Sequence, residues 1–308
     1  MNSAIIMAGG KGTRMKSKLA KVLHPVLGVP MVQWVVDSLK QAGSEKIVTV
    51  VGFQHEEVEK ALEGQCEFAL QDQQLGTGHA VKQAVQLKNC DGITIVASGD
   101  CPSVTSDYYR ELYEMDDACD MIVLTTVLKE AGSYGRVIRN AQGMVEKIVE
   151  AKDASEEELK VCEINSGIYA FRTNKLFEAL ELLKNDNAQQ EYYLTDVLSI
   201  FREKGYQVQA RIIEDEKEVE GLNSLVELAS TNKYLQRRIN TEWMKKGVQM
   251  VDPETVYIGP YVQLEADVFI HPNVSLYGKT TVHSGAILYP GVYVENQEIP
   301  ENTRMSIQ

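Results

Sequence analysis

A glycine-rich loop near the amino terminus contains the first residues whose types and spacing suggest chemistry. It follows a short apolar run and reads Gly9, Gly10, Lys11, Gly12, Thr13, Arg14. Glycines let a backbone turn sharply and bring its N–H groups against phosphate oxygens, while Lys and Arg add positive charge. Neither a Walker loop nor a dinucleotide fingerprint is present, because Thr13 and Met15 stand where those patterns need Lys and Gly. On composition alone the loop could bind phosphate or be an ordinary turn.

A basic cluster follows this loop. Lys16, Lys18, Lys21 and His24 come within ten residues, and Pro25 stops any helix there. The chain as a whole is acidic, with a formal net charge of −13 and a pI near 5.0. That balance argues against sequence-independent nucleic-acid binding, which depends on Lys and Arg. Positive charge concentrated beside a glycine-rich loop instead favours a small anionic ligand.

Two later segments place polar residues directly after apolar runs. Gln71 and the turn Gly76-Thr77-Gly78 lie in one of them, and Ser98-Gly99-Asp100-Cys101-Pro102 follows the run 93–97. Asp100 is therefore expected at the carboxyl end of a strand. Taken alone, Gln71 could be an ordinary loop residue, and Asp100 could be a helix N-cap or turn residue.

Residues 18–25, taken with the glycine-rich loop, resemble the sugar-nucleotide pyrophosphorylase family. The resemblance is closest to the uridyltransferase half of bacterial bifunctional N-acetylglucosamine-1-phosphate uridyltransferases, whose other half is a glucosamine-1-phosphate acetyltransferase. It continues in order through about residue 250, at 71–79, 98–102, 134–136, 150, 165 and 219–223. Each of these positions alone would be an ordinary structural residue, so their joint order and spacing carry the resemblance.

The resemblance implies roles for individual residues. Arg14, Lys21 and Asp100 are expected to be catalytic, and Asp100 and Asn223 to bind Mg²⁺. Gln71 would recognise the edge of uracil, since an amide offers both a donor and an acceptor. The full set expected to contact substrate is Met7, Ala8, Gly9, Gly10, Lys21, Gln71, Gly76, Thr77, Ser98, Gly99, Asp100, Gly135, Glu150, Asn165 and Asn223.

Two segments fit the family pattern less well. Many members carry an aromatic residue where this chain has Ser98, so contacts to nucleotide at that point differ here. The segment 191–196 resembles one beside the sugar, but its two tyrosines could simply belong to the core.

The implied reaction joins UTP and N-acetylglucosamine 1-phosphate to give UDP-N-acetylglucosamine and pyrophosphate. A phosphate oxygen of the sugar phosphate would attack the α-phosphorus in line, with Mg²⁺ and no covalent intermediate. Two alternatives stay open: a related nucleotidyltransferase for another sugar or base, such as glucose 1-phosphate or dTTP, and a non-catalytic nucleotide-sugar-binding protein.

The elements that must position these residues alternate between strands and helices. Short apolar runs at 4–7, 46–51, 93–97, 120–126 and 168–171 predict buried strands, and 31–41 and 79–86 have helical spacing. Strand and helix in repetition predict an α/β fold, a Rossmann-like, doubly wound and mostly parallel sheet over residues 1–223. Ligands of such sheets bind outside the carboxyl ends of the strands.

Residues 224–308 follow a different pattern. A polar helical linker is expected over 224–250, ended by Gly247. Aliphatic residues then recur every six positions from Ile258 to Val294, which predicts a short left-handed β-helix over 251–308, although plain alternating strands could also place apolar residues at these offsets. A little over two coils are expected, so the acetyltransferase activity of the bifunctional relatives should be absent. In the family this solenoid forms trimers, which makes a homotrimer through the β-helix a possible assembly.

Composition indicates the setting. Five scattered cysteines without a close pair argue against a disulfide framework or a zinc site. No stretch of eighteen or more apolar residues is present, so no membrane partner is expected. A cytoplasmic protein is the expectation, with UTP, the sugar phosphate and Mg²⁺ as its small-molecule partners and no nucleic acid.

Overall fold

The computed structural model describes residues 1–307, and these form two compact units. The first contains Met1–Leu23 and Met31–Asn223, and the second contains His24–Pro30 together with the chain from Ser224 onward. The short segment in the second unit is a hairpin of β2 (Pro25–Val26) and β3 (Val29–Pro30).

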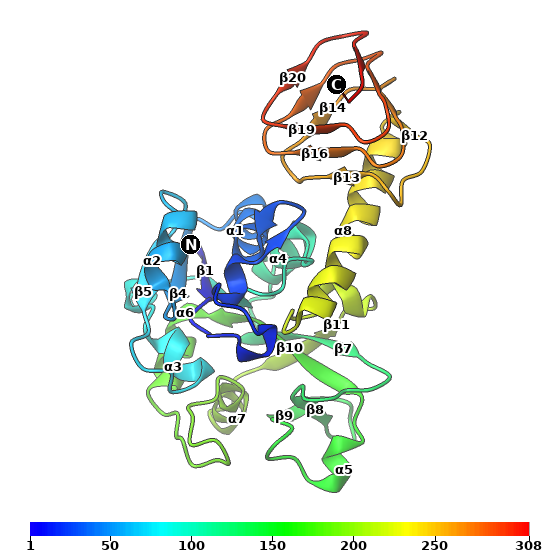
Figure 1. The fold of residues 1–308 in the computed structure, drawn as a ribbon. Helices are drawn as coiled ribbons and strands as arrows, with labels where there is room; N and C mark the ends of the chain where they lie inside the picture. The colour runs from blue at the N-terminus through cyan, green and yellow to red at the C-terminus, as the bar shows by residue number, and fades with distance from the viewer. Residues whose placement is uncertain (308) are drawn as a thin grey trace. The chain divides into compact units, whose positions relative to one another are not determined.

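The first unit is built on a nine-stranded sheet, with the order β11-β7-β10-β6-β1-β4-β5 and the pair β8–β9 attached to β10 (Figure 1). The parallel pairs are β1 with β4 and β6, β4 with β5, and β7 with β11, whereas β10 runs antiparallel to β6 and β7. The strands are β1 Asn2–Met7, β4 Lys46–Val51, β5 Glu67–Leu70, β6 Ile93–Ser98, β7 Met121–Val127, β8 Arg136–Arg139, β9 Val145–Val149, β10 Glu163–Arg172 and β11 Val208–Ile212. The expected mostly parallel α/β sheet is confirmed.

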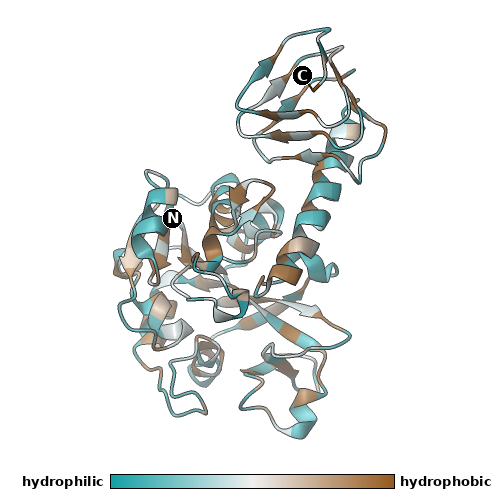
Figure 2. Cartoon of the chain, in the orientation of Figure 1, coloured by the Kyte–Doolittle hydropathy of each residue, from teal (hydrophilic) through white to brown (hydrophobic). Residues whose placement is uncertain are grey.

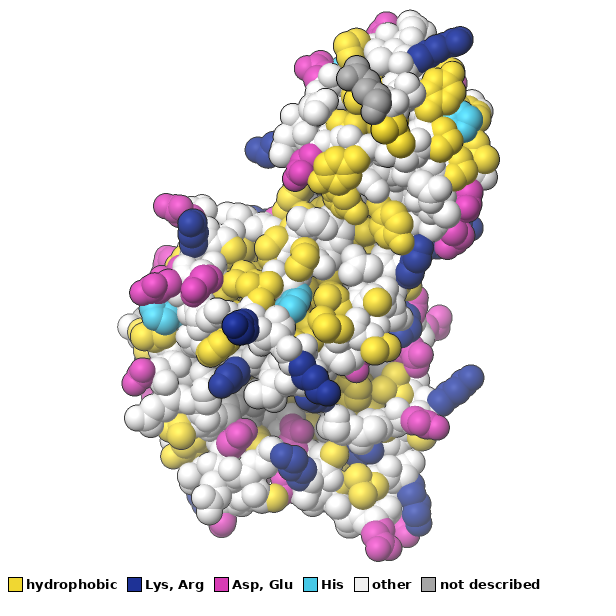
Figure 3. Space-filling view, viewed as in Figure 1, with side chains coloured by type: hydrophobic (Ala, Val, Ile, Leu, Met, Phe, Trp, Pro, Cys, Tyr) yellow, Lys and Arg dark blue, Asp and Glu magenta, His cyan; other side chains and the backbone are white. Residues whose placement is uncertain are grey.

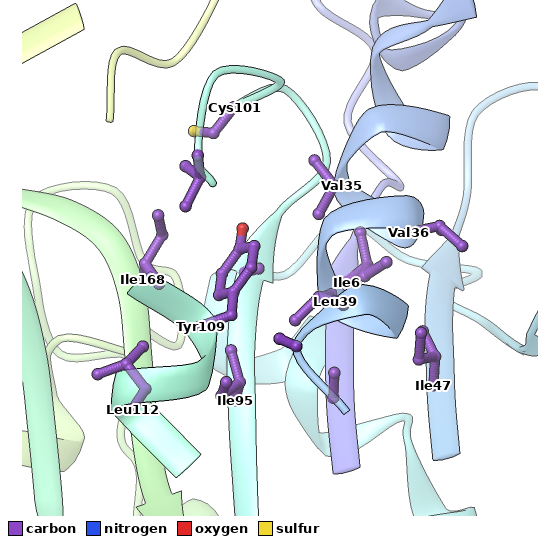
Figure 4. Close-up of a cluster of buried hydrophobic side chains, with 14 of the residues drawn as sticks. Ile6, Val35, Val36, Leu39, Ile47, Ile95, Cys101, Tyr109, Leu112 and Ile168 are labelled. Atoms are coloured by element: carbon purple, nitrogen blue, oxygen red, sulfur yellow. The ribbon is translucent and has the colours of Figure 1, made fainter. Parts of the chain in front are cut away.

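Helices cover both faces of this sheet. They are α1 Met31–Gln41, α2 His55–Ala61, α3 Thr77–Lys82, α4 Ser106–Tyr113, α6 Thr173–Leu180 and α7 Asp196–Glu203. The single turn α5 (Glu156–Leu159) has no buried residue. Successive residues of β1 point to opposite faces, so Ile6 packs with α1, α2 and α4, and Ile5 packs with α3, α6 and α7. Figure 4 shows the first of these clusters, where Tyr109 and Leu112 of α4 meet Ile95, and Leu39 of α1 lies beside Ile6.

Two of these elements differ from the sequence expectation. The helix expected over 79–86 begins earlier, at Thr77, ends at Lys82, and is followed by a separate 3-10 turn, Val85–Leu87. The strand expected over 168–171 is the end of β10, which starts at Glu163 and contains a register shift between Asn165 and Tyr169. In Figure 2 apolar residues recur along the strands of the sheet, while α2 is largely hydrophilic.

The second unit contains the long helix α8 (Leu225–Lys245) and a stack of short strands. Ser224 begins the helix with a capping box, in which its side chain accepts from the Glu227 N–H and the Glu227 carboxylate accepts from the Ser224 N–H. Gln236 and Asn240 of α8 are buried and donate to the Val256 carbonyl, at 2.6 and 2.9 Å. No helix within residues 1–307 has the length and apolar character needed to cross a bilayer.

The strand stack is the expected short left-handed β-helix. Parallel pairing joins β12-β15-β18-β21, β13-β16-β19 and β14-β17-β20 on its three faces. The strands are β12 Gln249–Met250, β13 Tyr257–Ile258, β14 Gln263–Leu264, β15 Phe269–Ile270, β16 Ser275–Tyr277, β17 Thr281–Val282, β18 Ile287–Leu288, β19 Tyr293–Glu295, β20 Glu298–Ile299 and β21 Arg304–Met305. Both six-residue series predicted from the sequence, from Val256 to Val292 and from Ile258 to Val294, are buried inside the stack.

The expected count of a little over two coils is wrong, because β12 before the six-residue series and β20 and β21 after it add strands to the stack. Phe269 pairs with Ile287, eighteen residues later, but Thr281 pairs with Glu298, only seventeen residues later. This shortening by one residue interrupts the six-residue period, so the last coil cannot be recognised from the period in the sequence. The corners still adopt left-handed backbone where Asp, Asn or Gly stands, as at Asp267 (φ 64°) and Asn302 (φ 56°).

Candidate active site

A pocket opens where β1 and β6 end. These neighbouring strands pair Met7 with Ser98, so the loops that follow them leave the same edge of the sheet. The cavity measures about 280 Å³ and is lined by Met7, Ala8, Gly9, Gly10, Lys21, Val22, Gln71, Gln74, Gly76, Thr77, Ala80, Ser98, Asp100 and Glu191. Figure 3 shows Lys and Arg side chains around a hollow on this face. The pocket thus lies where open α/β sheets bind ligands.

The glycine-rich loop forms one wall of this pocket. A Cβ added to Gly10 would meet no atom within 4 Å, so open space lies over its backbone. Gly12 has a φ of +63°, and a Cβ there would lie 2.5 Å from the Cβ of Lys21. Glycine therefore serves two purposes in this loop, leaving room for a ligand at Gly10 and for the lysine at Gly12.

A second loop anchors the first. The Phe53 N–H donates to the Gly9 carbonyl at 3.1 Å, and Lys11 Nζ lies 5.5 Å from the centre of the Phe53 ring. Gln54 Oε1 accepts from the Ala20 N–H at 2.5 Å. The loop after β4 thereby holds both ends of the segment that carries Lys21.

Gln71 lies against the glycine-rich loop, where a Cβ on Gly9 would come 3.3 Å from its Oε1, and it is only 4% exposed. Its Nε2 donates to the Gly76 carbonyl and lies 3.1 Å from Nδ1 of His79. Gly76 has a φ of +109°, and a Cβ there would lie 2.6 Å from the Tyr192 carbonyl oxygen. The amide is thus held in one orientation by a loop that only glycine can form at this point.

Charged groups meet at the floor of the pocket. Lys21 Nζ forms an ion pair with Asp100 Oδ2 and donates to Asn223 Oδ1 at 2.7 Å. Arg14 Nη2 donates to the same Asn223 oxygen at 2.7 Å. Asp100 is 9% exposed, and its other oxygen, Oδ1, accepts from Ser98 Oγ at 2.6 Å. Residues separated by about two hundred positions in the chain therefore form one polar cluster.

Asp100 is held in its charged form. Burial raises the pKa of this carboxyl, but the charge of Lys21 and hydrogen bonds from Lys21, Ser98 and Cys101 outweigh burial and leave the pKa below its usual value. The same environment acts oppositely on Cys101, because burial and the neighbouring carboxylate raise the pKa of its thiol well above normal. The cluster thus presents an anionic carboxylate and a neutral thiol.

The donor set fits Mg²⁺. Oδ2 of Asp100 and Oδ1 of Asn223 converge on one positive group, the Lys21 ammonium. Mg²⁺ in phosphate-handling sites usually takes one or two protein oxygens plus phosphate oxygens. No cluster of three or more His, Cys, Asp and Glu side chains suited to a metal ion occurs in residues 1–307.

Three of the expected substrate residues form a second group: Gly135 directly precedes β8, Glu150 directly follows β9, and Asn165 lies in β10. The Asn165 N–H donates to the Gly135 carbonyl at 2.9 Å, and a Cβ on Gly135 would lie 3.6 Å from Glu150 Oε1. Asn165 lies at the register shift of β10, where its Oδ1 accepts from the Gly167 N–H and its Nδ2 donates to the Tyr169 hydroxyl at 2.6 Å. One donor and one acceptor position of this amide remain for a ligand.

The segment 191–195 connects the two groups. Glu191 lines the pocket, the Leu194 N–H donates to Thr77 Oγ1 at 3.0 Å, and Thr195 Oγ1 donates to Glu150 Oε1 at 3.2 Å. Burial raises the pKa of Glu150, and the Thr195 hydrogen bond opposes this less strongly; the carboxylates of Asp196, Asp153 and Glu191 raise it further.

The structure brings most of the expected residues together. Met7, Ala8, Gly9, Gly10, Lys21, Gln71, Gly76, Thr77, Ser98 and Asp100 line one pocket, and Arg14 and Asn223 join it through the polar cluster. Gly99 does not line the pocket, and its N–H donates to the Met7 carbonyl. Of the basic segment, Lys21 lines the pocket, whereas Lys16 and Lys18 are exposed.

Several lining residues were not expected from the sequence. Gln74 and Glu191 lie inside segments that the family resemblance had marked, so those segments were the available signal. Val22 and Ala80 carry no chemical signal of their own. Cys101 does not line the pocket, but its Sγ donates to Asp100 Oδ1 at 3.5 Å, and its only signal in the sequence was its place next to the aspartate.

The sheet and the polar cluster at its edge define a nucleotidyltransferase. The model of the MobA-like NTP transferase domain matches residues 4–194. The fold also resembles that of a nucleotidyl transferase from Methanothermobacter thermautotroptrophicus, with a TM-score of 0.55 at 20% identity over 77% of this chain and 99% of that one.

More particularly, the chain belongs to the family of the bifunctional protein GlmU. It is 44% identical over 305 residues to that protein from Listeria monocytogenes serovar 1/2a, and 48% identical over 303 residues to that from Oceanobacillus iheyensis. These matches cover 98% and 97% of this chain and 67% of each relative. The chain therefore spans about two thirds of the length of these relatives.

Proposed function

We propose that the protein transfers the uridylyl group of UTP to N-acetylglucosamine 1-phosphate, which gives UDP-N-acetylglucosamine and pyrophosphate. The observation that carries this proposal is the cluster of Arg14, Lys21, Asp100 and Asn223 beside the glycine-rich loop. A protein that only binds a nucleotide sugar has no need of a metal-binding carboxylate and amide next to two cations. The family relationship supports the same reaction.

In this proposal, separate groups of residues bind the two substrates. Gln71, Gly76 and Thr77 would hold uracil, with the Gln71 amide fixed by the Gly76 carbonyl. The N–H groups of the loop from Ala8 to Gly10 would contact the phosphates of UTP. Gly135, Glu150 and Asn165 would hold the amino sugar on the other side of segment 191–195.

Catalysis in this proposal rests on positioning and charge. Two anionic substrates must approach, and Lys21 and Arg14 offset their repulsion while Asp100 and Asn223 provide oxygens for Mg²⁺. When bound, Mg²⁺ adds positive charge at the phosphate oxygens of both substrates. The attacking group is an oxygen of the sugar phosphate itself. The buried thiol next to Asp100 is neutral, which does not suit it to act as a nucleophile.

A substrate panel tests the proposal. Pyrophosphate release is measured with UTP, dTTP, ATP and GTP against N-acetylglucosamine 1-phosphate, glucosamine 1-phosphate and glucose 1-phosphate, each with and without Mg²⁺. Mg²⁺-dependent release with UTP and the N-acetylated sugar should exceed every other pair. A better rate with glucose 1-phosphate or dTTP would move the assignment to a related nucleotidyltransferase. Tight binding of UDP-N-acetylglucosamine without any release would favour a binding protein.

Asp100→Ala should abolish turnover and leave the fold intact. The substitution removes the carboxylate that pairs with Lys21, and loss of one such electrostatic contact costs on the order of 10²-fold or more in rate. Turnover and circular dichroism are measured on the same preparation. Asp107→Ala is the control, because that exposed residue of α4 pairs only with Arg110 among the contacts described. A rate near wild type in the Asp100 variant would rule out the metal assignment.

We also infer that these 308 residues lack acetyltransferase activity and that the β-helix forms a homotrimer. The stack contains three short faces with at most four strands each, whereas the bifunctional relatives are half as long again as this chain. Release of free thiol from acetyl-CoA in the presence of glucosamine 1-phosphate tests the first point, and detectable release would contradict it.

A further inference from the structure

The two oxygens of the Asp100 carboxylate have different partners. Oδ2 pairs with the Lys21 ammonium, which also contacts Asn223 Oδ1. Oδ1 points the other way and accepts from Ser98 Oγ at 2.6 Å and from Cys101 Sγ at 3.5 Å. The carboxylate is therefore held from both sides, one oxygen by cations and the other by two neutral donors.

Both neutral donors come from residues whose backbone is fixed. Ser98 is the last residue of β6 and pairs with Met7 of β1. Cys101 is 2% exposed and belongs to the core cluster under α1 and α4. The Leu222 N–H donates to the Asp100 carbonyl at 3.0 Å, so the main chain of Asp100 is held as well. What remains free to rotate is the side chain, and the two donors restrict it.

We propose that Ser98 and Cys101 are positioning residues for Asp100, which hold Oδ1 so that Oδ2 faces Asn223 Oδ1 and the divalent cation of the proposed reaction. Ser98 gives the larger share, since a hydroxyl is a better donor than a thiol. This inference rests on the proposed function for its metal. It also assigns a purpose to Ser98, where many members of the family carry an aromatic side chain that has no hydroxyl at Cβ.

The alternative arrangement of the carboxylate explains why such positioning matters. Without donors on Oδ1, rotation of the side chain lets both oxygens turn to the Lys21 ammonium, which offers three N–H donors. If both oxygens of the carboxylate bind the Lys21 ammonium, neither oxygen is available to coordinate a cation. Loss of the donors should therefore weaken metal use more than it weakens nucleotide binding.

The test compares three variants with a matched control. Ser98→Ala removes the main donor, Ser98→Ala combined with Cys101→Ala removes both, and Ser98→Thr keeps a hydroxyl at the same Cβ. The control is Ser3→Ala, a buried hydroxyl on the adjacent strand β1 that bonds to Thr94 Oγ1 at 2.9 Å and lies outside the pocket. The Mg²⁺ concentration for half-maximal pyrophosphate release is measured for each variant, together with KM for UTP.

In the double variant the Mg²⁺ requirement should rise about tenfold, the usual effect of losing a hydrogen bond to a charged group, and KM for UTP should rise by a clearly smaller factor. Ser98→Thr should restore most of the loss, and Ser3→Ala should behave as wild type. An unchanged Mg²⁺ requirement would overturn the proposal, as would equal changes in the Mg²⁺ requirement and in KM, which indicate a general structural effect.

A metal-free crystal structure of the double variant gives a readout independent of activity. Asp100 should leave its present orientation and turn both oxygens towards Lys21. If the side chain stays in place, Ser98 and Cys101 do not position it, and the inference fails. If wild-type protein shows no pyrophosphate release, the proposed function fails instead, and the crystal structure still decides whether the two residues orient Asp100.

Discussion

Lys21 connects the glycine-rich loop with Asp100 and Asn223. Its Cβ lies where a side chain on Gly12 would otherwise be, and its ammonium reaches both Asp100 and Asn223. Arginine would be a poor replacement, because its planar fork cannot place one nitrogen between a carboxylate and an amide in the same compact way. The glycine-rich loop thus positions a lysine as well as exposing backbone N–H groups.

The pH dependence of KM for the sugar phosphate, compared between wild type and Glu150→Gln, tests whether Glu150 binds the sugar. Burial and nearby carboxylates raise the pKa of Glu150, so protonation begins at a higher pH than for an ordinary glutamate of pKa 4.5. Because the ionised form is the better acceptor for sugar hydroxyls, KM for the sugar phosphate in the wild type should rise as the pH falls towards this pKa. The substituted enzyme should show a KM about tenfold higher near neutral pH.

The control for this prediction is the pH dependence that remains in Glu150→Gln, which reports the substrate phosphate alone. KM is measured from initial rates between pH 5 and 8 for both proteins. Parallel pH profiles in the two enzymes would show that Glu150 does not titrate in this range or does not contact the sugar.

At the scale of elements, the loop from Gly76 into α3 depends on a backbone that other residues cannot adopt. Gly76→Ala would place a Cβ within 2.6 Å of the Tyr192 carbonyl oxygen, at a φ of +109°. Neither backbone can move away without disturbing the Gly78 N–H bond to the same oxygen. KM for UTP should rise at least tenfold, because the displaced carbonyl of Gly76 no longer orients the Gln71 amide.

Gly64→Ala is the matched control for this substitution. Gly64 also has a positive φ of +70°, but a Cβ there meets no atom within 4 Å. It should cost about 1–2 kcal/mol in stability from backbone strain and leave KM for UTP unchanged. If both substitutions alter KM equally, the effect comes from general destabilisation, not from the loop.

Individual elements also show which parts of the fold could be predicted from the sequence and which could not. The central strands were predictable because buried parallel strands are apolar on both faces, as in 46–51 and 93–97. The shift in β10 was not, because Asn165 and Gly167 form it through bonds to each other and to Tyr169 that no local pattern reveals. Likewise the bond between Arg14 and Asn223 joins residues 209 positions apart, so only the family resemblance could pair them.

A charged cluster on one face of the β-helix makes its stability depend on pH. His283, in the loop after β17, lies between two glutamates, with its Nδ1 3.0 Å from Glu265 Oε1 and its Nε2 2.9 Å from Glu298 Oε1. Both contacts can be hydrogen bonds at the same time only when both ring nitrogens carry a hydrogen, that is, when the ring is charged. Hydrogen bonds from the ring to Glu298 and then to Glu265 raise the pKa of His283 above 6.5, while the hydrogen bonds that Glu265 accepts from the Ser284 N–H and from His283 lower the pKa of Glu265 below 4.5.

His283→Gln should therefore destabilise the protein in a limited pH range. A raised histidine pKa contributes stability that is complete below pH 6.5 and disappears as the pH rises through the folded-state value. A lowered glutamate pKa contributes stability above pH 4.5 that disappears as the pH falls through its folded-state value. The difference in melting temperature between wild type and variant should be largest between these limits and shrink at alkaline pH.

Calorimetry at several pH values measures this difference. Glu298→Gln is the companion variant, because it removes one partner and keeps the ring, and it should show a smaller loss over the same range. A melting difference that stays constant from pH 5 to pH 9 would mean that packing of the ring, not its charge, stabilises the coils.

At the scale of the whole molecule, charge is distributed unevenly. The chain carries a net charge of −13, yet basic side chains gather at the pocket of the first unit (Figure 3). A local positive region on an acidic protein attracts small anions. This distribution suits a substrate pair made of a triphosphate and a sugar phosphate.

The β-helix supplies the last prediction, which concerns assembly. Its faces differ. Glu265, His283 and Glu298 line one face. On another, the rings of Tyr277 and Tyr293 lie with their centres 5.8 Å apart and tilted by 48°, and Tyr293 is 61% exposed. A short stack would gain stability if its exposed aromatic face were buried against other copies, as in the proposed trimer. Light scattering should give a mass of about three times 34.4 kDa. Tyr293→Glu should reduce this mass to that of one chain, whereas Glu298→Gln on the charged face should leave it unchanged.

A single-chain mass for the wild type at micromolar concentration would exclude the trimer, and a trimer that persists in Tyr293→Glu would move the interface to another face.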